Sequence, residues 1–155
     1  MKNKVPKDIL VLCEYIARGY ERRKKDYENR RTDIIYHSSA GYFADRVGGG
    51  GGSKCGNVSD PSARKAELLE KLENSLEARF MKAVERALAE VGGDVTRDSR
   101  EKLRKAIMLN CESGRDYPYE VLNIDEFSRR DFYRRRRRFI VGIGEALELI
   151  QQSDF

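Results

Sequence analysis

Apolar residues spaced three and four positions apart recur along the chain and predict an all-α fold. The first such stripe belongs to a helix expected from about Pro6 to Arg31. Its members are Ile9, Leu12, Cys13, Ile16, Tyr20 and Tyr27. The β-branched residues do not alternate over any useful length, so the sequence has little from which to build a sheet. Residues 1–35 are therefore expected to form an N-terminal helical arm.

A long amphipathic helix is predicted from Asp60, as its N-cap, to Val91, where a glycine pair follows. Its apolar residues again step by three or four positions: Leu69, Leu72, Leu76, Phe80, Val84, Leu88 and Val91. These residues form a continuous apolar stripe along the helix, which we call the 60–91 seam. Such a stripe either packs against other helices of the chain or pairs with a second copy of the chain. Internal packing and a homodimer through the 60–91 helix both stay open.

The segment between these helices, residues 36–58, shows no periodicity and contains five consecutive glycines. This composition is typical of a flexible connector. A phosphate-binding P-loop would need GxxxxGK followed by Ser or Thr, with a strand before it, and the segment has neither. We therefore expect no nucleotide cofactor here, and we expect a helical domain over residues 59–155.

Two further helices are predicted near the C-terminus. The first begins near Thr96 to Asp98 and is ended by Ser113 and Gly114. Its apolar face is made of Leu103, Ile107, Met108 and Cys111. Residues 117–122 have room for one or two helical turns. Ser128 then caps the last helix, with Asp131 as its reciprocal capping partner. A helix, a tight connection and a second helix form a helix-turn-helix, expected over about 97–150.

The last helix has two different faces. At 100° per residue, one side collects Phe132, Phe139, Ile143, Ala146, Leu147 and Ile150. The opposite side collects Arg130, Arg134, Arg137 and Arg138. Arg136 falls near the apolar side, so we expect it to lie along that side or to pair with an acid. The apolar side should hold the helix while the other side stays cationic.

Charge is concentrated on this same helix. The net charge of the chain is +5, and residues 129–138 alone carry seven arginines and one aspartate, which leaves the remainder slightly negative. A positive charge concentrated on one surface is typical of a site that binds a polyanion. Arginine suits such a site because its guanidinium forms bidentate hydrogen bonds to guanine edges and to phosphates. The residues predicted to contact DNA are Ser128, Arg129, Arg130, Tyr133, Arg134, Arg135, Arg137 and Arg138. Arg129, Arg130, Tyr133 and Arg134, in the first turns, are the expected base readers, and most of the others should contact phosphates.

Other classes of chemistry find little support in the sequence. The three cysteines are far apart and there is a single histidine, His37, so neither a disulfide framework nor a zinc site is expected. Without an acid pair in an apolar setting, we expect no enzyme, no cofactor and no metal. The apolar N-terminal stretch is broken by Glu14 and Arg18. The chain is therefore expected to be a soluble cytoplasmic protein with no membrane span.

The segment Phe127–Arg138 resembles the phage late-operon transcription regulators of the ArpU and RinA type, which look like the helix-turn-helix part of sigma factors. Their pattern is an apolar residue, Ser, two variable positions, Thr-Phe-Tyr and a basic stretch, and Asp131 replaces the usual threonine here. The N-terminal Arg-Lys run, the glycine-rich connector and the start at Asp60 are similar as well. This resemblance implies an activator of phage or prophage late genes in a bacterial host, with duplex DNA and host RNA polymerase as partners.

Two alternatives remain open beside this interpretation. One is a phage small terminase subunit, which recognises packaging-site DNA and assembles into rings. The other is an arginine-rich antitermination factor, because a basic helix can enter an RNA groove widened by bulges. The mass of the assembly distinguishes the first, and competition between duplex DNA and structured RNA distinguishes the second.

Overall fold

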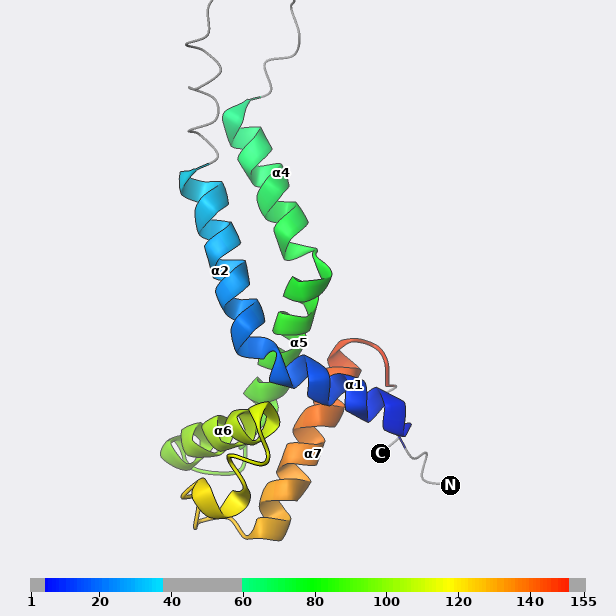
Figure 1. The fold of residues 1–155 in the computed structure, drawn as a ribbon, viewed down its shortest axis with the longest axis vertical. Helices are drawn as coiled ribbons and strands as arrows, with labels where there is room; N and C mark the ends of the chain where they lie inside the picture. The colour runs from blue at the N-terminus through cyan, green and yellow to red at the C-terminus, as the bar shows by residue number, and fades with distance from the viewer. Residues whose placement is uncertain (1–4, 38–59, 151–155) are drawn as a thin grey trace, which may run out of the picture. The chain divides into compact units, whose positions relative to one another are not determined.

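The computed structural model describes residues 5–37 and 60–150, and all regular secondary structure in these ranges is helical (Figure 1). The elements are α1 (Lys7–Arg18), α2 (Tyr20–Tyr36), α4 (Pro61–Glu73), α5 (Leu76–Glu90), α6 (Arg97–Glu112), the 3-10 helix η1 (Tyr119–Val121) and α7 (Arg129–Ala146). The predicted all-α class is confirmed. None of the helices in these ranges is both long and apolar enough to cross a membrane.

The chain divides into two compact units, which we describe separately. Unit 1 comprises the described residues of 1–21 and 79–155, and unit 2 comprises those of 22–78. In this division the first turns of the N-terminal arm group with the C-terminal helices. Most of the predicted connector, from residue 38 to residue 58, lies outside the described residues.

Unit 2 is built from α2, α4 and the first turn of α5. The Lys65 ammonium donates a hydrogen bond to the Ile35 carbonyl at 3.0 Å, which ties α4 to the end of α2. Arg23 is buried, and its Nε donates to a Glu77 carboxylate oxygen at 2.7 Å. Buried charge is tolerated here because it is paired.

Two helices predicted to be continuous are each broken. Gly19 ends α1, where its N–H donates to the Tyr15 carbonyl, and glycine is a poor residue for a helix interior. Ser75 separates α4 from α5: its hydroxyl donates to the Leu72 carbonyl and accepts from the Ala78 N–H. Leu76, next to this break, is 58% exposed. The apolar seam predicted over 60–91 is therefore not continuous.

Unit 1 has its core where α1, α5, α6 and α7 meet. The largest fully buried side chains in it are Phe132, Phe139, Ile16, Leu103, Ile107, Ile143, Val84 and Cys13. The predicted α6 is confirmed, because the Thr96 hydroxyl accepts from the Ser99 N–H at its start and Ser113 follows its end. Three of its four predicted apolar residues are buried, and Met108 is half-buried.

Arginines of α6 satisfy carbonyls at the end of α5 and in the turn that follows it. Arg100 Nε donates to the Gly92 carbonyl at 2.8 Å, and Arg104 Nε donates to the Val91 carbonyl at 3.1 Å. Guanidinium groups are favourable at a helix C-terminus because its carbonyls lack partners within the helix. Gly92 has a φ of +77°, and a Cβ there would lie 2.9 Å from Arg100 Cγ. Glycine is required at this turn.

The connection between α6 and α7 spans residues 113–128 and includes η1, which confirms the helical turn expected within 117–122. A helix-turn-helix joins its two helices by a turn of only about three or four residues. The predicted helix-turn-helix is therefore not confirmed in its details, although the two helices it needs are present.

Candidate nucleic-acid interface

The start of α7 is fixed by its own sequence. The Ser128 hydroxyl accepts a hydrogen bond from the Asp131 N–H at 3.2 Å, so the predicted N-cap is confirmed. The Asp131 carboxylate does not act as the reciprocal capping partner expected from the sequence. It accepts instead from Arg134 and from Arg135 Nε, the latter at 2.8 Å.

One side of α7 is anchored in the core of unit 1. Phe132 is fully buried, and its ring centroid lies 5.9 Å from that of Tyr119 and 5.2 Å from that of Tyr133. Of the predicted apolar side, Phe132, Phe139, Ile143 and Ile150 are buried, and Ala146 and Leu147 are half-buried. Every residue from 139 to 144 is buried. Only the first ten residues of α7 therefore have an outward face.

That outward face is cationic. Arg130, Arg134 and Arg137 are all exposed, and their spacing of four and three residues places them on one stripe of the helix. The stripe is about 10 Å long, at 1.5 Å per residue. Beside it, Arg129 lies 5.9 Å from the ring centroid of the exposed Tyr133 and donates to a Glu120 carboxylate oxygen at 2.7 Å.

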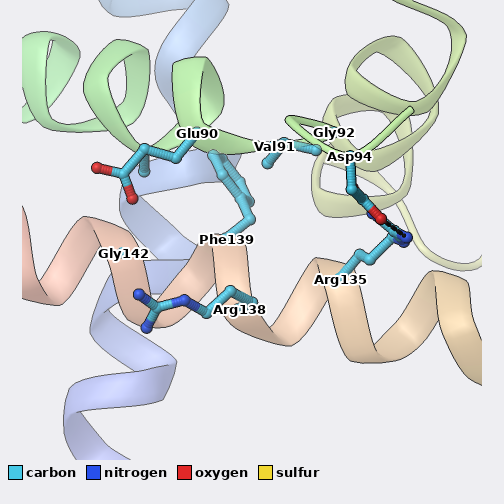
Figure 2. A pocket seen from close by; sticks show the side chains of 9 residues that line it. Glu90, Val91, Gly92, Asp94, Arg135, Arg138, Phe139 and Gly142 are labelled. Carbon is cyan, nitrogen blue, oxygen red and sulfur yellow. Dashed lines mark hydrogen bonds and ion pairs between the residues drawn. The ribbon is translucent and has the colours of Figure 1, made fainter. Parts of the chain in front are cut away.

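Arg135 points to the fold rather than to solvent. Its two terminal nitrogens each donate to the Asp94 carboxylate at 2.7 Å, as Figure 2 shows, and its guanidinium lies 5.3 Å from the Phe127 ring centroid. Its side chain is 19% exposed. The hydrogen bonds from Arg135 lower the pKa of Asp94 to about 2, and they lower the pKa of Asp131 as well. Arg135, predicted to contact DNA, is thus engaged in holding α7 to the loop after α5.

Arg136 and Arg138 also have acidic partners. Arg136 donates to a Glu14 carboxylate oxygen at 3.0 Å, which confirms the expected pairing with an acid. Arg138 donates to Glu145 at 3.0 Å and lines a hollow of about 330 Å³ between α5 and α7, together with Glu90 (Figure 2). The hollow carries both charges, so it offers no uniformly cationic site.

Acidic side chains from several elements offset much of the arginine block. Five of its seven arginines pair with five carboxylates, so the seven arginines and these carboxylates together carry a formal charge of +2, whereas residues 129–138 alone carry +6. The five are Glu14, Asp94, Glu120, Asp131 and Glu145. Helical spacing identifies only Asp131 and Glu145 as neighbours, and sequence reasoning missed the other three. Within the described ranges, Arg130 and Arg137 are exposed and have no ion pair.

Two cysteines lie in the described part of the chain, and both are in the core. No group of three His, Cys, Asp or Glu residues in that part of the chain could hold a metal ion. Cys13 and Cys111 are buried and unbridged, and burial raises the pKa of each thiol to about 11. Thiols with such a pKa stay protonated near neutral pH and are poor nucleophiles.

Comparison with known proteins adds no assignment to this surface. No protein-family model, curated protein or solved structure matches the chain. The likeness to late-operon regulators therefore remains a prediction from the Phe127–Arg138 segment, and a function has to be argued from α7 itself.

Proposed function

We propose that the chain is a sequence-specific DNA-binding transcription regulator that places the first turns of α7 in the major groove. The observation that carries this proposal is the exposed stripe of Arg130, Arg134 and Arg137 on a helix whose opposite side is anchored by the buried Phe132, Phe139 and Ile143. The major groove is about 12 Å wide and admits an α-helix. A helix with its side chains is about 10–12 Å in diameter, so the outward face of α7 fits into that groove.

The arginines of α7 take different roles in this proposal. Arg130 and Arg134 read base edges, because first-turn residues enter the groove most deeply. Arg137 and Arg138 contact phosphates and set the orientation of the helix. Arg135, bound to Asp94, acts by keeping α7 in place.

Three neighbours complete the proposed surface. Arg129 and Tyr133 flank the arginine stripe and can reach the same strand of DNA. The Ser128 hydroxyl accepts a backbone hydrogen bond and keeps its own hydrogen for a phosphate oxygen. A role in activating phage or prophage late genes, with host RNA polymerase as a partner, extends the proposal on the family resemblance alone.

The experiment that tests the proposal first selects a preferred site from a random duplex library and then compares arginine variants on that site and on unrelated DNA. Arg130→Ala or Arg134→Ala should cost about 1 to 3 kcal/mol on the preferred site and much less elsewhere. Arg137→Ala should weaken both complexes about equally. Arg97→Ala, which removes an exposed arginine from α6, is the matched control and should change neither.

Each other outcome has a definite meaning. Equal losses for all α7 variants on both DNAs would make the helix a non-specific anchor. Unchanged binding would remove α7 from the interface. Preferred binding of structured RNA in competition would favour the antitermination factor, and a ring of many copies would favour the small terminase subunit.

Salt dependence provides a second test of the same surface. The arginine block has two unpaired arginines and five exposed ones, so we expect about two to five phosphate contacts. These contacts predict a slope of log affinity against log salt concentration of about −2 to −4.5. Affinity should then fall roughly 15- to 500-fold between about 50 and 200 mM salt. A flat profile would contradict phosphate contact by α7.

A further inference from the structure

The helix α1 is apolar on both of its sides. Its inner side, with Cys13, Ile16 and Ala17 buried, packs against α6 and α7 within unit 1. Its outer side exposes Val11 (65%) and Tyr15 (60%), with Leu12 (42%) beside them. Single exposed apolar residues are common on protein surfaces, but three adjacent ones on a short helix form a patch suited to a partner.

Charged residues close this patch at both ends. Asp8, Val11, Tyr15 and Arg18 follow one another at spacings of three, four and three, which is the spacing of a helix-pairing seam. At 100° per residue this seam lies opposite the buried side of α1. Asp8 and Arg18 are exposed, and neither has an ion-pair partner within the described residues.

The seam is complementary to itself when two copies run antiparallel. With a two-fold axis passing near residue 13, Val11 faces Tyr15 of the partner subunit, and Asp8 faces Arg18 of the partner subunit. Both contacts occur twice, as in any two-fold interface. A parallel pair would instead place Asp8 beside Asp8 and Arg18 beside Arg18, which is repulsive.

We propose that the outer side of α1 is a homodimer interface formed by an antiparallel pair of α1 helices. The partner on this surface is a second copy of this chain. The seam reads acid, apolar, apolar, base, so in an antiparallel pair each acid faces a base and each apolar residue faces an apolar residue. This interface differs from the 60–91 seam considered from the sequence, and it does not depend on the proposed DNA binding.

The dimer should be weak and reversible. The twelve residues of α1 make a helix about 18 Å long. One pair of such helices buries much less than the roughly 1,200 Å² of a stable interface. We expect a dissociation constant on the order of 100 µM at low salt.

Sedimentation velocity of the full chain, from about 1 to about 500 µM, tests the proposal. The wild type should shift from monomer to dimer across this range, and Val11→Asp should remain monomeric throughout. Val121→Asp is the matched control, because Val121 is 55% exposed in η1, and it should dimerise as the wild type does. A wild type that stays monomeric overturns the proposal. So does a dimer unaffected by Val11→Asp, which would have to use another face.

Charge reversal tests the antiparallel pairing itself. Asp8→Arg and Arg18→Asp should each weaken self-association about tenfold, since each creates two repulsive contacts. An equimolar mixture of the two variants should form a heterodimer, because every reversed charge then faces its opposite. The double variant should dimerise like the wild type. Failure of both the mixture and the double variant to recover association would overturn the antiparallel arrangement.

Discussion

Replacing Phe132 by alanine should lower the free energy of unfolding by about 3 to 5 kcal/mol. The side chain is fully buried, and its ring contacts those of Tyr119 and Tyr133 at centroid distances of 5.9 and 5.2 Å. Burying a phenylalanine contributes about 1.5 to 3 kcal/mol, and its aromatic contacts about 0.5 to 1.5 kcal/mol each. Ile124 and Phe127 are buried as well. We therefore expect the cavity to persist rather than close.

Urea unfolding followed by far-ultraviolet circular dichroism measures this loss. The midpoint should fall at an unchanged m-value, since the variant exposes a similar surface on unfolding. Phe132→Leu should cost less, because most of the volume is kept. Tyr133→Ala, on the exposed side of the same helix turn, is the control and should cost less than about 1.5 kcal/mol, mainly its ring contact. A loss under about 1 kcal/mol for Phe132→Ala would refute the conclusion that this ring anchors the start of α7.

Two further predictions concern the acids around the arginine block. Glu120→Gln removes the carboxylate that pairs with Arg129 and so frees this arginine for phosphate contact. The slope of log DNA affinity against log salt concentration, measured by fluorescence anisotropy, should then steepen by up to about one. The control variant Glu112→Gln should leave this slope unchanged. A slope that stays the same or becomes shallower in Glu120→Gln would contradict this. Arg135 lowers the pKa of Asp94 from 3.8 to about 2. The ionised, paired carboxylate therefore stabilises the fold at pH values above about 4, and this contribution to the free energy of unfolding is lost as the pH falls from about 4 to about 2. Asp94→Asn should therefore lower stability at neutral pH and flatten its decline at acid pH, as urea unfolding over a pH series would show. An unchanged acid profile would count against the pairing.

Features that depend on neighbouring residues could be predicted from the sequence. The all-α class, the caps Asp60 and Ser128, and the buried side of α7 are all correctly identified. A cap involves groups only two or three residues apart, and an apolar stripe repeats with each turn. The break at Ser75 follows the same local rule, since its hydroxyl accepts from the Ala78 N–H. It was missed because the apolar spacing continues across it.

What the sequence by itself determined is that residues 129–138 form a capped helix with one apolar and one arginine-rich side. Only the tertiary structure decided which arginines stay available to a ligand. Arg135 pairs with Asp94, 41 positions away, and Arg136 pairs with Glu14, 122 positions away. Such pairs depend on how helices pack, and no local period encodes them. The helix has its outward face only over its first turns for the same reason, because α1 and α5 reach it from distant parts of the chain and help to bury the rest.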